Sequence, residues 1–308
     1  MGLTVALAGG VGAAKLLRGL AKIVPPQNLI IIGNTGDDLE LHGLHVSPDL
    51  DTIMYTLSGI VDETKGYGIT ADTFNCLNML GKMGHETWFK LGDRDLATHI
   101  TRTMLLRKGR TLSQATTELC RALGVKPRLT PMSNDPVRTR IISDKKTLDF
   151  QDYFVKKATN INVTDVHYEG AEEAKPAPGI LEALKKAQKL VICPSNPVLS
   201  IAPILSIPAI RNEVKNSKAH VVAISPIIAG KTIKGPADKI MATMGLDASA
   251  YGVAKYYKDI LDHLIIDAAD RDQKTKIEKL GIKTTVTKTI MKSQKDSARL
   301  AETVMRTE

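Results

Sequence analysis

The clearest indication of the fold lies near the N-terminus, in Leu3-Thr-Val-Ala-Leu-Ala-Gly-Gly-Val-Gly-Ala-Ala-Lys15. Its first six residues form a short apolar run that stops at a pair of glycines, and leucines then recur at helical spacing over residues 16–20. A continuous apolar run without polar alternation is typical of a strand covered on both faces. We therefore predict a buried strand, a glycine-rich turn and a helix as the first βα unit.

The same order of apolar run, polar turn and helical pattern recurs along the chain. Further apolar runs cover residues 28–32, 190–193, 220–224, 263–267 and 283–286, and a last helix is expected from about Ser293. Strands that alternate with helices pair in parallel, with helices on both faces of the sheet. The sequence therefore predicts an α/β fold with a Rossmann-like, doubly wound, mainly parallel sheet, whose ligands bind beyond the carboxyl ends of the strands.

The middle of the chain, from about residue 70 to 185, has a different pattern. Helical spacing covers residues 72–81 and 111–123, and residues 139–142 and 148–150 have the pattern of a small hairpin around 144–146. We predict one nucleotide-binding α/β domain over residues 1–308. A mostly helical insertion at about 70–185 would cover the ligand-binding edge.

Composition indicates the general class of the protein. Apolar and charged residues make up 43% and 24% of the chain, as in ordinary globular proteins. No apolar run reaches the ~20 residues of a membrane helix, and the N-terminus lacks a signal-peptide pattern, so we expect a cytoplasmic protein without a membrane partner. Three scattered cysteines argue against disulfides or a zinc site, and we expect each to be a core residue.

The net charge of +9 raises the question of nucleic-acid binding. Much of the lysine excess, however, lies in one helical stretch, residues 274–295, which has no aromatic residues for base stacking. We expect no nucleic-acid partner. A solvated basic face that favours anionic small-molecule substrates is the better interpretation.

The glycine-rich turn after the first run suits a phosphate. Gly9, Gly10 and Gly12 allow close approach to the backbone, the helix N-terminus offers free N–H groups, and Lys15 adds positive charge. The turn matches neither a Walker A sequence nor the dinucleotide fingerprint. The alternative is a tight βα turn without a ligand.

Four carboxylates follow the second run within fifteen residues: Asp37, Asp38, Asp49 and Asp51. Hard oxygen ligands suit Mg²⁺, which usually binds one or two carboxylates together with substrate phosphate. The alternative is structural, because Asp49 or Asp51 could cap a helix that begins near Thr52.

The segment Trp88-Phe-Lys-Leu-Gly-Asp-Arg-Asp95 places the only tryptophan beside a charged turn. Trp88 could stack on a flat ring or belong to the core. The charged residues could serve an acceptor site or form a surface ion-pair turn. His99 follows Asp95 at i+4 on one helical face, where it could simply be the partner of that carboxylate.

Two later strand ends carry rigid polar turns. Ser195 and Asn196 lie in Pro-Ser-Asn-Pro, while Ser225 and Pro226 follow the run at 220–224. Such groups suit recognition of a nucleobase or ribose, and ordinary turn chemistry is the alternative. No Gly-x-Ser-x-Gly or His-Glu-x-x-His motif supports serine-hydrolase or zinc-protease chemistry.

These segments, in this order, resemble the 2-phospho-L-lactate transferase family of deazaflavin coenzyme biosynthesis. The most specific motif is Leu91-Gly-Asp-Arg-Asp-Leu-Ala-Thr-His99; the others are the turns at residues 9–15, 34–38, 47–52, 194–197, 225–228 and 235–237. There are two departures from the family pattern, Asn134 where an acid is expected and Ala229 where glycine is usual.

The resemblance implies a transferase with a Rossmann-like fold that depends on Mg²⁺. A guanosine diphosphate that carries lactate or enolpyruvate would donate its phospho-acid to the terminal ribityl hydroxyl of the deazaflavin Fo, and GMP would leave. The product belongs to the biosynthesis of coenzyme F-420. The resemblance also implies that Asp49 and Asp51 bind Mg²⁺ and the ribityl hydroxyls, with Asp51 as the base that accepts the proton.

The remaining site residues follow from the same resemblance. Fo would lie near Asp51, Trp88, Lys90, Asp93 and Arg94. Phosphate oxygens would face the first glycine-rich turn, Asn34 and Asp37 would steady that region, and the guanosine would contact Ser195, Asn196, Ser225 and Pro226. Asp51→Asn is predicted to lower turnover by several orders of magnitude while leaving the fold intact.

Two other functions compete with this interpretation. A non-catalytic nucleotide-sugar-binding regulator would share the glycine-rich turn and the Asn-x-x-Asp-Asp turn, but would not need the Leu-Gly-Asp-Arg-Asp block. A nicotinamide dehydrogenase is disfavoured because the acid expected ~20 residues after the glycine-rich turn lies within an aspartate-rich turn instead. We expect a homodimer because such assemblies are common.

Overall fold

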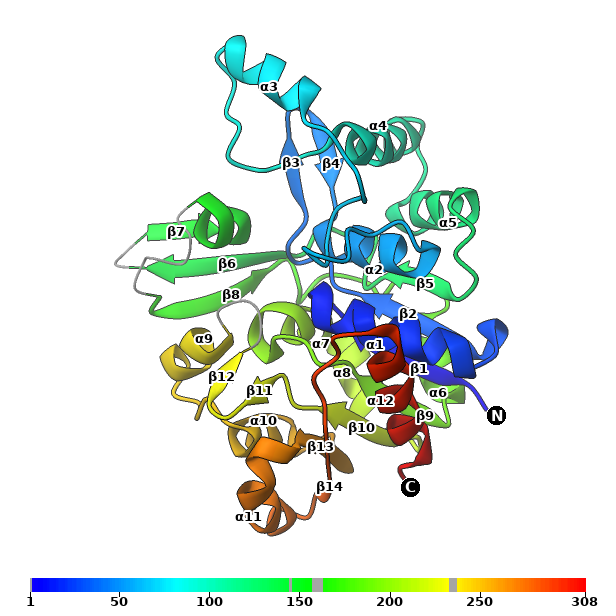
Figure 1. The fold of residues 1–308 in the computed structure, drawn as a ribbon, viewed down its shortest axis with the longest axis vertical. Helices are drawn as coiled ribbons and strands as arrows, with labels where there is room; N and C mark the ends of the chain where they lie inside the picture. The colour runs from blue at the N-terminus through cyan, green and yellow to red at the C-terminus, as the bar shows by residue number, and fades with distance from the viewer. Residues whose placement is uncertain (1, 144–145, 157–162, 233–236) are drawn as a thin grey trace.

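The computed structural model describes residues 2–143, 146–156, 163–232 and 237–308, and a seven-stranded sheet forms its centre (Figure 1). The strand order is β14-β13-β10-β9-β1-β2-β5, and every neighbouring pair is parallel. The strands are β1 (Thr4–Ala8), β2 (Leu29–Gly33), β5 (Arg128–Pro131), β9 (Lys189–Ile192), β10 (His220–Ile224), β13 (His263–Asp267) and β14 (Lys283–Thr287). The predicted α/β fold with a parallel sheet is confirmed.

The apolar runs become strands because helices cover both faces of the sheet. All five residues of β1 are buried. Ala6 and Ala8 face a core shared with α1 (Gly10–Ile23), α2 (Pro48–Ser58), α5 (Leu112–Ala122) and α12 (Gln294–Arg306). Val5 and Leu7 face the other core, built with α6 (Ile180–Lys186), α7 (Ala202–Leu205), α8 (Pro208–Lys215), α9 (Ala237–Thr243) and α10 (Ala250–Tyr257).

The topology locates a ligand crevice. The chain leaves β1 towards β2 and β5 on one side, and later adds β9, β10, β13 and β14 on the other side. The strand order therefore reverses between β1 and β9. In open parallel sheets, ligands bind outside the carboxyl ends of the strands at such a switch point.

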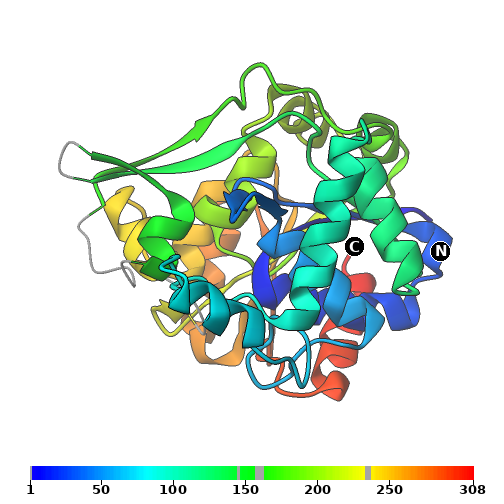
Figure 2. The ribbon, with the colours of Figure 1, turned by 90° about the horizontal axis from the view of Figure 1, so that it is seen from above.

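The middle segment contains more than helices. The predicted helices are confirmed as α3 (Asn75–Lys82) and α5, and α4 (Asp93–Arg107) lies beside α5 (Figure 2). β5 was not predicted, yet it joins the central sheet next to β2. The proposed extent of an insertion at 70–185 stays a prediction, and this stretch includes a central strand.

Smaller β structures surround the central sheet. The predicted hairpin is confirmed as β6 (Arg138–Ser143) and β7 (Lys146–Asp149), joined by β8 (Asp165–Glu169) in an antiparallel sheet; its turn at 144–145 lies outside the described residues. Two further hairpins pair β3 (Leu39–Leu41) with β4 (Leu44–Val46), and β11 (Ile227–Ile228) with β12 (Lys231–Thr232). In Figure 1, α3 lies at the end of the molecule opposite α11 (Lys274–Glu278).

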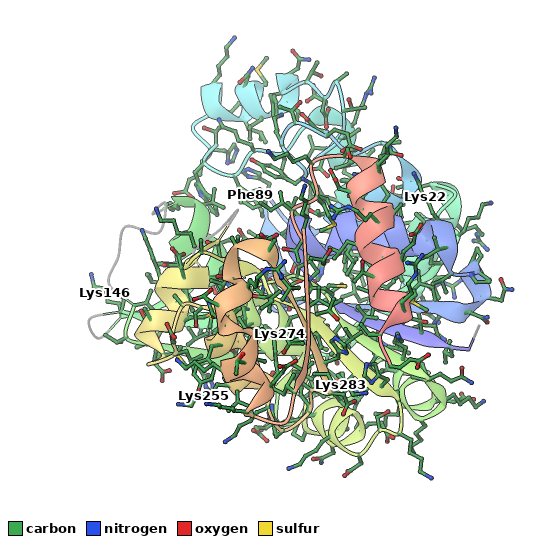
Figure 3. The ribbon with its side chains drawn as sticks, turned by 60° about the horizontal axis from the view of Figure 1, so that its bottom comes forward. Lys22, Phe89, Lys146, Lys255, Lys274 and Lys283 are labelled. Atoms are coloured by element: carbon green, nitrogen blue, oxygen red, sulfur yellow. The ribbon has the colours of Figure 1, made fainter. Side chains whose placement is uncertain are left out.

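Two sequence interpretations were wrong. Residues 274–295 are not one helical stretch, because α11 has only five residues and β14 follows it. Cys76 is exposed, whereas Cys120 and Cys193 are buried as expected. Lys22, Lys255, Lys274 and Lys283 lie on different elements and are dispersed over the molecule (Figure 3). In the described part of the chain, no helix combines the length and apolar character needed to cross a membrane.

Candidate functional site

Three predicted site residues meet where β1, β2 and α2 converge. The side chain of Asn34, directly after β2, donates from Nδ2 to Asp49 Oδ2 at 2.9 Å and accepts at Oδ1 from the Gly36 N–H at 2.8 Å. A Cβ atom on Gly9 would lie 2.5 Å from Asp49 Oδ2. Gly9 is therefore required by the close approach of this carboxylate, and the predicted convergence at the sheet edge is present.

The glycine-rich turn is also tied to β9. Ser195 Oγ donates to the carbonyl oxygen of Gly9 at 2.8 Å, which joins the two strand ends across the switch point. A Cβ on Gly12 would lie 2.2 Å from the Pro194 carbonyl oxygen, and Gly10 has a φ of 73°. The geometry of a tight βα turn thus accounts for these glycines, and their contact with phosphate stays a prediction.

Lys15 lies on the first turns of α1, where its Nζ donates to the carbonyl oxygen of Met291 at 3.2 Å. This bond connects α1 to the loop before α12. It also holds the ammonium group on the side of the helix that faces that loop. Its predicted contact with a phosphate stays a prediction.

Two of the carboxylates near Asn34 have raised pKa values. Burial, with a further contribution from Asp38, raises the pKa of Asp49 to about 6, against the opposing hydrogen bonds of Asn34 and Gly10. Burial and the negative charge of Asp49 also raise the pKa of Asp37 well above its usual range. One oxygen each of Asp37 and Asp38 is buried without a hydrogen-bond partner.

Asp38 differs from Asp37 because its second oxygen is well paired. Asp38 Oδ2 accepts from Ser47 Oγ at 2.8 Å and lies 3.0 Å from His45 Nε2.

Among the described residues, no group of three or more His, Cys, Asp or Glu side chains is spaced to hold a metal ion. Mg²⁺ commonly takes only one or two protein carboxylates and completes its shell with water and phosphate.

Asp51, two residues after Asp49, has very different surroundings. Both of its oxygens accept from the buried guanidinium of Arg102, from Nη1 to Oδ2 at 3.1 Å and from Nη2 to Oδ1. Sequence reasoning missed Arg102. Asp95, His99 and Arg102 are spaced i, i+4 and i+7 on α4, a pattern that places them on one helical face and could have revealed it.

The interpretation of His99 as the partner of Asp95 is confirmed. His99 Nε2 lies 3.1 Å from Asp95 Oδ1, and Tyr55 Oη donates to the same oxygen at 2.6 Å. Burial acts to raise the pKa of Asp95, but His99, Tyr55 and Arg102 outweigh it, and the pKa lies below its usual range. Asp95 is therefore part of a buried polar network and not of a surface ion-pair turn.

Asp93 and Arg94 anchor the chain before α4. Asp93 accepts from Thr73 Oγ1 and from the backbone N–H groups of Asn75 and Cys76, and these bonds lower its pKa to about 2. Asp93 thereby caps α3. Arg94 is exposed and donates to the Thr70 carbonyl oxygen at 3.1 Å. Contact of either residue with an acceptor substrate stays a prediction.

Asp72, in turn, caps the N-terminus of α4. Its carboxylate accepts from the N–H of Arg94 at 2.7 Å and from the N–H of Asp95 at 3.0 Å. We expect Asp72→Ala to lower the free energy of unfolding by about 1 kcal/mol, because two helix N–H groups lose their acceptor. Urea denaturation measures the loss, and Asp72→Ser, which keeps a capping oxygen, should retain most of the stability. An equal loss in both variants would contradict this assignment.

Trp88 and Lys90 lie on the loop between α3 and α4. Trp88 is half-buried, belongs to neither core cluster, donates from Nε1 to Glu86 Oε2 at 2.9 Å and lies with its ring 5.7 Å from Lys156 Nζ. Lys90 is exposed. Phe89, which meets Trp88 edge-on, lies between the α3 segment and the body of the molecule (Figure 3).

Side-chain hydrogen bonds within the later polar turns stabilise the conformation of those turns. Asn196 Oδ1 accepts from the N–H groups of Val198 and Leu199 and so caps the helical segment Pro197–Ile201. Ser225 Oγ donates to the Ile227 carbonyl oxygen at 2.9 Å, and Pro226 is half-buried beside it. These bonds are ordinary turn chemistry at the ends of β9 and β10. Their contact with guanosine stays a prediction.

The two residues that depart from the family pattern, Ala229 and Asn134, each take part in a hydrogen bond. Ala229 adopts a φ of 49°, and its N–H donates to the buried Asp270 at 3.1 and 3.2 Å; sequence reasoning missed Asp270. Asn134 Oδ1 accepts from the Ser113 N–H at 2.8 Å at the start of α5. An amide oxygen can accept this bond as a carboxylate would. Of the motif at 235–237, Gly235 and Pro236 lie outside the described residues.

Two surface hollows lie elsewhere. One, of about 520 Å³, lies between α5 and β5 and is lined by Arg110, Arg121 and Arg128. The other, of about 430 Å³, lies on the small antiparallel sheet and includes Arg140 and His167. Neither is lined by a predicted site residue, so the buried polar contacts, and not concavity, identify the candidate site.

Comparisons with known proteins give a consistent result. Residues 4–305 match the family described as 2-phospho-L-lactate transferase CofD. A 2-phospho-L-lactate transferase of Methanosarcina mazei is 40% identical over 98% of this chain and 99% of its own length. A phosphoenolpyruvate transferase of Streptomyces griseus is 43% identical over 91% and 90%. A Bacillus halodurans protein of known crystal structure shares the fold, with a TM-score of 0.67 at 19% identity and 99% coverage of both chains.

Proposed function

Because the chain belongs to the CofD family of 2-phospho-L-lactate transferases and is thus a transferase, we propose a specific reaction for it. The donor is a guanosine diphosphate that carries lactate or enolpyruvate. The acceptor is the terminal ribityl hydroxyl of the deazaflavin Fo. The product is an intermediate of coenzyme F-420, and GMP is released.

The observation that carries the proposal is the meeting of Gly9, Asn34 and Asp49 at the switch point of the sheet. A diphosphate placed there would lie beside backbone N–H groups at the start of α1, where anions are favoured. Ser195 holds the adjacent end of β9 against the same turn. We infer that the guanosine extends from this point towards the turns that follow β9 and β10.

Mg²⁺ fits the carboxylates beside this turn. Asp37 and Asp49 are buried, repel each other and have no cation at hydrogen-bond distance among the described residues, and oxygen ligands are those that Mg²⁺ prefers. When bound, Mg²⁺ would neutralise charge on the diphosphate and on the departing GMP. Asp49 is the better ligand of the predicted pair, because both oxygens of Asp51 already accept from Arg102.

The chain's own residues would position the acceptor. In the proposed reaction the ribityl oxygen attacks the phosphorus that bears the acid, the bond from that phosphorus to the bridging oxygen breaks, and GMP leaves with the electron pair. Asp51 would accept the hydroxyl proton, and its fixed carboxylate would orient that hydroxyl for in-line attack. Trp88, Lys90 and Arg94 would border the acceptor.

Titration with Fo tests the proposal. Fluorescence of Fo is followed as protein is added, with and without Mg²⁺ and GDP. We expect saturable binding at micromolar Fo that depends on the nucleotide, followed by GMP release from the lactyl or enolpyruvyl donor; comparison of the two donors identifies the natural acid. No Fo binding under any condition, together with saturable binding of a uridine sugar, would transfer support to a nucleotide-sugar regulator.

A further inference from the structure

Helices α2 and α4 are joined by a buried chain of polar side chains. From α2, Asp51 and Tyr55 are spaced i, i+4 and point at α4. From α4, Asp95 accepts the Tyr55 hydroxyl and Arg102 donates to Asp51, while His99 lies between the two bonds. The network therefore connects the predicted base on α2 to Asp95, His99 and Arg102 on α4.

Arg102 is the central member of this chain. Its side chain is 1% exposed, and Nη1 contacts Asp51 Oδ2, the His45 carbonyl oxygen at 3.4 Å and His99 Nδ1 at 3.3 Å. A guanidinium has only donors, so Arg102 Nη1 is the donor in its contact with His99 Nδ1. His99 Nε2 lies 3.1 Å from Asp95 Oδ1 without hydrogen-bond geometry, so the imidazole lies between Arg102 and Asp95 and is hydrogen-bonded to Arg102.

A buried ion pair of this kind is a poor source of stability, because desolvation of the two charges offsets much of their attraction. It is a good source of orientation. The guanidinium is a rigid planar fork that matches both oxygens of a carboxylate, whereas a lysine ammonium contacts a carboxylate as a point charge. Asp51 therefore has one orientation, which its position in the first turn of α2 alone would not impose.

We propose that Arg102 is a positioning residue for the acceptor hydroxyl, acting through Asp51. This role rests on the proposed function, in which Asp51 contacts the ribityl hydroxyl. Arg102 holds the Asp51 carboxylate so that an oxygen lone pair points at the acceptor, and the contacts with His99 and the His45 carbonyl oxygen hold Arg102. Arg102 itself touches neither donor nor acceptor.

Arg102→Lys is the decisive variant, since it keeps the buried charge and loses the fork. We expect its turnover number to fall by about 10- to 100-fold, the size of effect that a small misplacement of a reacting group produces. The KM for the donor should stay within about twofold, because the diphosphate contacts lie on other elements. Arg107→Lys, at an exposed position of the same helix, is the matched control and should be as active as the parent.

A second comparison separates positioning from a general structural role. In the Asp51→Asn background, Arg102→Lys should have no further effect on turnover, because Arg102 acts only through Asp51. Urea denaturation of each variant measures stability separately from activity. An equal loss in both backgrounds, or an unchanged turnover number in Arg102→Lys, overturns the role. If the parent and Arg107→Lys both fail to turn over the substrates, the proposed function itself fails, and this role falls with it.

Discussion

The Asp51→Asn variant is expected to lose about 10³-fold or more in turnover and also to unfold more easily than the parent. Turnover falls because the asparagine cannot accept the hydroxyl proton, and general base catalysis typically contributes 10²- to 10⁴-fold. Stability falls because Arg102 would remain buried and charged without its partner, which typically costs about 3–5 kcal/mol. Steady-state kinetics and urea denaturation measure the two effects.

The expected loss of stability differs from the prediction made from the sequence alone, in which Asp51→Asn leaves the fold intact. The double variant Asp51→Asn/Arg102→Met is the control, since it removes the unpaired charge. We expect it to regain most of the lost stability and none of the turnover. Near-normal turnover in Asp51→Asn would remove Asp51 from the mechanism, whereas an unchanged free energy of unfolding would contradict the buried pair.

The Asp49→Asn variant is expected to lose turnover and gain stability. We expect turnover with Mg²⁺ to fall by about 10²-fold or more, because the proposed Mg²⁺ site would lose a carboxylate ligand. The ligand-free protein should become more stable near pH 7, because a buried carboxylate repelled by Asp38 is replaced by a neutral side chain of the same shape. Kinetics at saturating Mg²⁺ and urea denaturation without Mg²⁺ measure the two effects.

The stability effect has a definite pH dependence. Asp49 has a pKa of about 6 in the folded protein and 3.8 as a free side chain, so between these values the folded state binds more protons than the unfolded state. Its contribution is therefore complete below about pH 4 and is lost as the pH rises through 6, a change of at most about 3 kcal/mol. The difference in stability between variant and parent should grow over this window. A difference that is constant with pH would contradict the buried, proton-binding Asp49.

The elements predicted correctly from the sequence are those whose own residues are enough to indicate a buried strand. The central residues of β1, β10 and β13, namely 5–8, 221–224 and 264–266, are continuously apolar and buried. β5 escaped prediction because its four residues, Arg-Leu-Thr-Pro, form a short and partly polar edge strand. The β3–β4 hairpin escaped because its strands have three residues each.

The candidate site likewise has some features that the sequence predicted and others that it did not. The apolar runs alone predicted that the strand ends carrying Gly9, Asn34 and Ser195 would meet, because parallel strands expose their carboxyl ends at one edge. The pairing of Asp51 with a cation, and of Asp49 with the neutral amide of Asn34, became apparent from the three-dimensional contacts. The two carboxylates are two residues apart on one helix, and what distinguishes them is Arg102, which α4 brings from fifty-one residues away. A charged side chain takes its role from the groups that replace its lost water, and those groups come from distant segments of the chain.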